Sequence, residues 1–110
     1  YLVRIHVVRR LAPELVAAAA YDQDAEVRRW VARRIPVERL NLLVRDPEPM
    51  VRLVVAERLP PERLHALAKD EDLRVRFTVV ERCPKEMLQG FLEDADELVR
   101  ASARARLAGD

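Results

Sequence analysis

One dipeptide recurs at a fixed spacing along the whole chain. Val-Arg stands at five places, each 24 residues after the last: Val3-Arg4, Val27-Arg28, Val51-Arg52, Val75-Arg76 and Val99-Arg100. Other charged columns keep the same step, among them the aspartates Asp22, Asp46, Asp70 and Asp94. A period of this length is typical of a repeat protein, in which each unit folds by stacking on its neighbours. We place the repeats at 1–21, 22–45, 46–69, 70–93 and 94–110.

The pattern within one repeat predicts helices. Counting from each repeated valine as offset zero, apolar residues fall at offsets zero, four and eight, as in Val27, Val31 and Ile35, and form one stripe of an α-helix. A proline follows the stripe, at Pro36, Pro60 or Pro84 for example, and should end the helix. The apolar spacing after the proline predicts a second, short helix, α or 3₁₀.

Composition supports the all-α prediction and limits the partners. Half of the 110 residues are hydrophobic and only two are glycine, whereas a many-stranded protein needs frequent turn residues. The formal net charge of +1 provides no field that would draw the whole molecule to nucleic acid or to a membrane. The longest apolar run, residues 15–21, is too short to span a bilayer. A single cysteine, Cys83, suits a reducing compartment, and we expect a cytoplasmic protein.

The repeats resemble those of the leucine-rich repeat variant family, whose units are also 24 residues long. The resemblance rests on the period, on Val-Arg, on the Arg-Leu-Pro of residues 58–60 and on the glutamate that follows, Glu62. It implies alternating α- and 3₁₀-helices, a choice that periodicity leaves open. HEAT-like repeats share the Asp-to-Val-Arg spacing but are longer. Stacking alone permits a superhelix of either hand, and we predict a right-handed α-solenoid of four to five repeats in a single domain, residues 1–110.

Both ends of the chain fall inside a repeat, and we expect a fragment of a longer protein. Open repeat ends would also favour self-association. Members of the family can carry an N-terminal cysteine-rich module that binds a 4Fe-4S cluster, which normally needs four thiolates. With Cys83 alone, this segment is expected to hold no cofactor, and such a module would lie before Tyr1.

Candidate catalytic and metal-binding residues are few. Cys83 stands at offset eight, where other repeats have leucine or isoleucine, so we interpret it as a core residue. His6 and His65 lie in different repeats at different offsets, which does not predict a metal site. The acidic columns are interpreted as helix caps and partners of the arginines. We therefore expect a protein that is not an enzyme.

The alternative function is nucleic-acid binding through the arginine columns at offsets one and seven. Residues 1–55 have a net charge of +3, but residues 56–110 have a net charge of −2, so a basic groove would change sign midway. Structural ion pairs are the preferred interpretation of these arginines.

The columns at offsets two and three differ from repeat to repeat. At about 200° and 300° around the helix, they lie away from an apolar stripe centred near roughly 40°. Solenoids often bind partners through such variable columns, and aromatic residues dominate many interfaces. We predict a protein-protein interaction or scaffold module with no membrane association and a protein partner. Its candidate surface comprises Ile5, His6, Arg29, Trp30, Leu53 and Phe77. Packing between repeats remains the other interpretation of Trp30 and Phe77.

Overall fold

The structure, a computed structural model, describes residues 16–109, and this part of the chain is helical without strands. It divides into two compact units, residues 1–58 and 59–110. Each unit is described by itself below.

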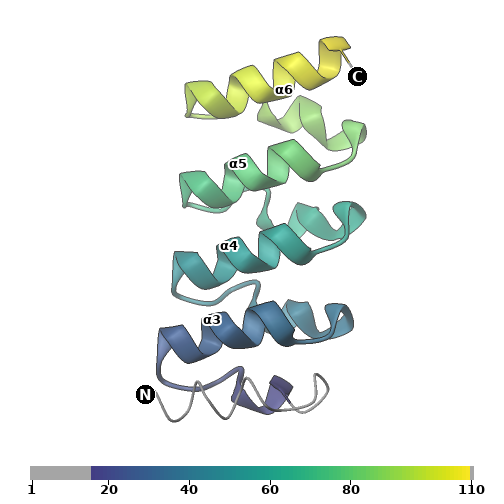
Figure 1. Ribbon diagram of the computed structural model, residues 1–110. Helices are drawn as coiled ribbons and strands as arrows, with labels where there is room; N and C mark the ends of the chain where they lie inside the picture. The colour runs from purple at the N-terminus through teal and green to yellow at the C-terminus, as the bar shows by residue number, and fades with distance from the viewer. Residues whose placement is uncertain (1–15, 110) are drawn as a thin grey trace. The chain divides into compact units, whose positions relative to one another are not determined.

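The described residues of the first unit, 16–58, contain two α-helices, each accompanied by a short 3₁₀-helix. Its elements are η1 (Ala17–Ala19), α3 (Ala25–Arg34), η2 (Val37–Leu43) and α4 (Pro49–Arg58). Helices α3 and α4 lie side by side, while η1 packs against α3 and η2 against α4 (Figure 1). Each repeat therefore contributes one strip to an α-helical layer and one strip to a 3₁₀ layer.

The second unit repeats this arrangement. It contains η3 (Pro61–Leu67), α5 (Leu73–Arg82), η4 (Lys85–Phe91) and α6 (Glu97–Gly109). Helices α5 and α6 lie side by side, η3 packs against α5, and η4 contacts both α-helices (Figure 1). The two units share the same order of elements because the same sequence pattern recurs in each.

Proline ends the α-helix in the middle repeats. The residue before it, Ile35 or Cys83, is extended, as the proline ring requires of its predecessor. Pro36 and Pro60 then start a 3₁₀-helix with φ near −57°, a value that the proline ring already fixes. The second helix of the repeat is thus 3₁₀, as the family resemblance implied and as periodicity alone could not decide.

The apolar stripe predicted at offsets zero and four forms the core. Val27 and Val31 are buried on α3, and Val75 and Val79 are buried in the same positions on α5. The 3₁₀-helices cover these stripes with pairs of large side chains three residues apart. These pairs are Leu40 and Leu43, Leu64 and Leu67, and Leu88 and Phe91.

Offset eight is buried in three repeats and exposed in the fourth. Ile35, Leu59 and Cys83 lie in the core, whereas Leu107 is 38% exposed. Leu107 lies in the last turn of α6, so the apolar stripe is less buried there than in the three preceding repeats. The all-α prediction is confirmed over residues 16–109. The predicted handedness and single domain stay predictions.

Candidate binding surface

The repeated aspartates close the turn before each α-helix. The Oδ1 atoms of Asp22, Asp46, Asp70 and Asp94 each accept a backbone N–H from two residues further on, at 2.8–2.9 Å. A second aspartate then caps the helix: Asp24 accepts the N–H of Glu26, and Asp72 accepts that of Arg74, both at 2.8 Å. Carboxylates at these positions satisfy free amides at the positive end of the helix dipole. The predicted capping role is therefore confirmed.

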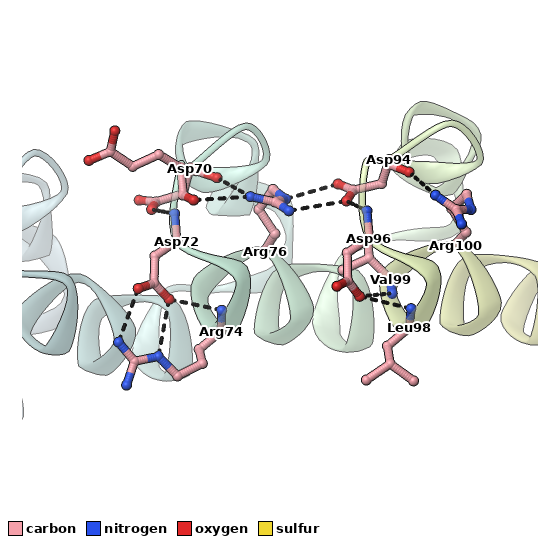
Figure 2. A network of polar contacts seen from close by, with 10 residues as sticks. Asp70, Asp72, Arg74, Arg76, Asp94, Asp96, Leu98, Val99 and Arg100 are labelled. Carbon is pink, nitrogen blue, oxygen red and sulfur yellow. Dashed lines mark hydrogen bonds and ion pairs between the residues drawn. The ribbon is translucent and has the colours of Figure 1, made fainter.

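Within each unit, an arginine at offset one links one repeat to the next. Nη1 of Arg76 donates to the carbonyl of Asp70 in its own repeat at 2.9 Å, while Nε and Nη2 hold both oxygens of Asp94 at 2.9 and 3.2 Å (Figure 2). Arg28 makes the same contacts in the first unit, to the carbonyl of Asp22 and to the carboxylate of Asp46, 18 residues ahead. A two-pronged arginine-carboxylate contact is strong and fixes orientation.

The charge states follow from this geometry. The hydrogen bond that Arg28 donates to Asp46 raises the pKa of Arg28, against the opposing effect of burial. Burial disfavours the charged form of Asp94, but the backbone N–H of Asp96 and the guanidinium of Arg76 outweigh it, so the pKa of Asp94 lies below its ordinary value. Arg28 and Asp94 are therefore both charged at neutral pH.

The arginines at offset seven reach backwards. Nη1 of Arg58 donates to the carbonyls of Ala32 and Ile35, at 2.8 and 2.6 Å, and Nη1 of Arg106 donates to those of Val80 and Cys83, at 3.0 and 2.7 Å. These carbonyls lie at the C-terminal end of the preceding α-helix, where they lack partners within the helix. The arginine therefore caps one repeat from the next. The sequence placed these arginines beside the core but did not predict this capping role. Every residue has a backbone carbonyl, so the identity of a side chain does not show which carbonyl accepts the hydrogen bond.

The candidate residues of the first unit lie on the outer side of α3 and α4. The Arg29 guanidinium pairs with Glu26 at 3.5 Å on the same helix. Trp30 is half-buried, and the guanidinium carbon of Arg33 lies 5.3 Å from the centre of its ring. Leu53 on α4 is also half-buried. Ile5 and His6, the other two predicted surface residues of this half, lie outside the described residues.

The candidate residue of the second unit is more open. Phe77 on α5 is 36% exposed, one of the larger exposed apolar side chains of the described residues. At offset three, Thr78 donates its hydroxyl hydrogen to the carbonyl of Arg74, and Ser102 on α6 donates to Glu81 on α5 at 2.7 Å. Val54, at the same offset, is buried, so a single variable column contains both core and half-buried residues.

Comparison with known proteins identifies the repeat. A family model described as leucine rich repeat variant matches residues 25–48. A solved structure titled "A leucine-rich repeat variant with a novel repetitive protein structural motif" is 39% identical and superimposes with a TM-score of 0.89 over 96% of this chain. The chain is built from leucine-rich repeat variant repeats. It spans 45% of the length of that solved chain. No curated protein matches it.

Cys83 is a scaffold residue of its leucine-rich repeat variant unit. It is a free thiol buried at the C-terminal end of α5, and burial raises its pKa. Nη1 of Arg106 lies 3.9 Å from its sulfur, but that nitrogen also caps the Cys83 carbonyl. A buried thiol with a raised pKa is a poor nucleophile.

Two exposed side chains of the leucine-rich repeat variant units escaped sequence reasoning. Leu73 is 39% exposed at the start of α5, and Leu98 is 65% exposed at the start of α6. Both lie before the repeated valine, where the repeats share no apolar column. Leu73 lies four residues before Phe77 on the same helix, and this spacing could have identified it from the sequence.

Two features are absent from residues 16–109. This part of the chain contains no cluster of three or more histidine, cysteine or acidic side chains arranged to hold a metal ion. Nor does it contain a helix with the length and apolar character needed to cross a membrane.

Proposed function

We propose that this chain is a non-catalytic scaffold module that binds a protein partner through the outer side of its α-helices. The observation that carries the proposal is a difference between the repeated charged residues and the residues that vary from repeat to repeat. The repeated aspartates and both arginine columns are bonded within the scaffold, as Arg76 with Asp94 and Arg106 with Cys83 illustrate. The side chains that differ between repeats therefore give the outer surface of each repeat its own character.

The character of these variable side chains supports a protein partner. Trp30 and Phe77 are aromatic, and aromatic residues contribute more binding energy at protein interfaces than most other types. Phe77 is accessible as it stands. Arg29 and Arg33 flank Trp30 on α3 and add polar contacts at its edge.

Catalysis and cofactor binding have no support in the same columns. Ser102 and Thr78 are the sole serine and threonine, and both hydroxyls donate within the scaffold. Nucleophilic catalysis needs a side chain with a neighbouring base and access to substrate, which buried Cys83 lacks. We propose that the segment has neither activity nor cofactor, and that its compartment is the reducing cytoplasm.

The competing proposal is a nucleic-acid binder. Its arginine columns would have to release Asp46, Asp94 and several backbone carbonyls before they could neutralise phosphates. Titration with duplex DNA and with RNA at low and at physiological salt tests it. Binding that weakens steeply with salt would favour this alternative, because contacts to phosphate release counterions.

The protein-binding proposal is tested by affinity capture from a native extract with wild type, Trp30→Ala and Phe77→Ser. Tyr21→Ser serves as the matched control, since Tyr21 is 77% exposed but lies outside the α-helices. A protein retained by wild type and by Tyr21→Ser, but lost with one outer-face variant of unchanged stability, supports the proposal. Equal capture by all four forms contradicts it.

A further inference from the structure

The second unit carries an apolar patch on the outer side of its α-helices. It consists of Leu73, Phe77 and Leu98, which are 39%, 36% and 65% exposed. Leu73 and Phe77 are four residues apart on α5 and therefore lie next to each other on one face. Exposed apolar patches that combine several large side chains mark interaction sites in soluble proteins.

Leu98 joins this patch from the neighbouring helix. The hydroxyl of Ser102 on α6 donates to Glu81 on α5. Residues that are 21 positions apart in the sequence therefore face each other across the two helices. Both helices run in the same direction, because contacts join Arg76 to Asp94 near their starts and Arg106 to Cys83 near their ends. One helical turn earlier, the same relation brings Leu98 beside Phe77. The three apolar side chains thus form one surface.

Opposite charges flank the patch symmetrically along α5. Arg74 lies three residues before Phe77, and Glu81 lies three residues after Thr78. The Arg74 side chain is 57% exposed and is held by Asp72 at 3.0 Å. Glu81 is also exposed. On α6, Glu97 pairs with both Arg100 and Arg104, at 2.7 and 3.0 Å, so the charges beside Leu98 are all bonded within that helix.

This arrangement is self-complementary under a two-fold axis. If α5 of one copy lies antiparallel to α5 of another, with the axis between Phe77 and Thr78, Arg74 of each copy faces Glu81 of the other. The two Phe77 side chains then lie beside the axis, and Leu73 of each copy lies one residue further out than Arg74. A two-fold interface uses the same patch on both subunits and needs this kind of complementarity.

We propose that the patch formed by Leu73, Phe77 and Leu98 docks a second copy of this chain, with Arg74 and Glu81 pairing across the two-fold axis. The inference rests on the proposed function in taking the outer side of the α-helices as the binding surface. It specifies the partner, and it places self-association on this face of the α-helical layer and not at the repeat ends.

Sedimentation equilibrium of the wild-type chain over a wide concentration range tests the proposal. We expect a monomer-dimer equilibrium that Phe77→Ser weakens by roughly tenfold or more, as removal of a central aromatic anchor does. Arg74→Glu alone and Glu81→Arg alone should each weaken the dimer by placing like charges opposite each other. The double variant Arg74→Glu/Glu81→Arg should restore it, because the exchanged pair is again complementary.

Two controls keep the outcome interpretable. Thermal unfolding by circular dichroism establishes that each variant is folded, and Leu107→Ser removes the exposed apolar residue at the other side of α6. Wild type that stays monomeric, or a dimer that the double variant fails to restore, overturns the proposal. So does a dimer lost with Leu107→Ser and kept with Phe77→Ser. A monomeric wild type that still captures another protein through Phe77 would leave the proposed function intact.

Discussion

The thiol of Cys83 shows what burial does to a reactive residue. Its pKa is raised because burial disfavours the thiolate, although Arg106 nearby acts in the opposite direction. The thiolate is the form that attacks thiol reagents, so we predict slow modification of the native protein. The rate of reaction with an aromatic disulfide reagent, measured in buffer and in denaturant, checks this. Comparable rates in the two solutions would show that Cys83 is accessible.

Asp94 makes stability depend on pH. Its folded-state pKa lies below the ordinary value, so the unfolded chain binds the proton more tightly. The stabilisation is therefore complete above the unfolded pKa of roughly 3.9 and is lost as pH falls through the folded value. We predict that the urea midpoint of wild type falls below about pH 4 more steeply than that of Asp94→Asn. Parallel pH profiles would contradict this role.

Single residues also mark where sequence reasoning succeeded. Asp94 recurs at a fixed offset before a helix, so its role in the turn that starts the helix could be predicted from position alone. The exposure of Leu98 could not, because it depends on which side of α6 a neighbouring helix leaves uncovered. A residue that does not recur carries no repeat signal.

At the level of the helices, the carboxyl end of α5 depends on the next repeat. Nη1 of Arg106 bonds two carbonyls there, whereas Arg104, two residues earlier, pairs only with exposed Glu97. We predict that Arg106→Met lowers the free energy of unfolding by about 1–3 kcal/mol, since it strands those carbonyls. Arg104→Met should change it by less than about 1 kcal/mol, as expected of an exposed ion pair.

Urea denaturation of the two variants gives the measurement, and each serves as the other's control for the loss of one guanidinium from α6. Equal losses of stability would mean that the contacts to Val80 and Cys83 contribute nothing beyond helix propensity.

The elements themselves were largely predictable. The spacing of Val27 and Val31 indicated an amphipathic helix, and Pro36 indicated its end. The choice between α and 3₁₀ for Val37–Leu43 was beyond periodicity, because seven residues fit either helix. Hydrogen bonds such as that from Arg39 N–H to the Pro36 carbonyl, three residues back, make it 3₁₀.

Across the whole molecule, the same polar contacts recur in both units. Arg28 with Asp46 and Arg76 with Asp94 are equivalent, and so are the caps made by Arg58 and Arg106. Such recurrence is visible in the sequence, and it predicted the scaffold. Phe77 and Leu98 do not recur from repeat to repeat, so the repeat pattern does not predict how exposed they are. Phe77 was already a candidate from the sequence, whereas the exposure of Leu98 was found only in the structure.

We propose that the repeated polar residues bond one repeat to the next within each unit, while variable outer residues serve binding. Arg76 and Phe77 are adjacent in sequence and belong to opposite classes. Arg76→Gln leaves the largely buried carboxylate of Asp94 without its guanidinium and should cost about 2–4 kcal/mol of unfolding free energy. Phe77→Ser should cost less than about 1 kcal/mol, because its side chain is partly exposed.

Equilibrium urea denaturation of Arg76→Gln and Phe77→Ser beside wild type distinguishes the two roles. We expect a large drop in the unfolding midpoint for Arg76→Gln and a small one for Phe77→Ser. A midpoint unchanged by Arg76→Gln but strongly lowered by Phe77→Ser would contradict it, because the arginine would then be free for binding and the phenylalanine would belong to the core.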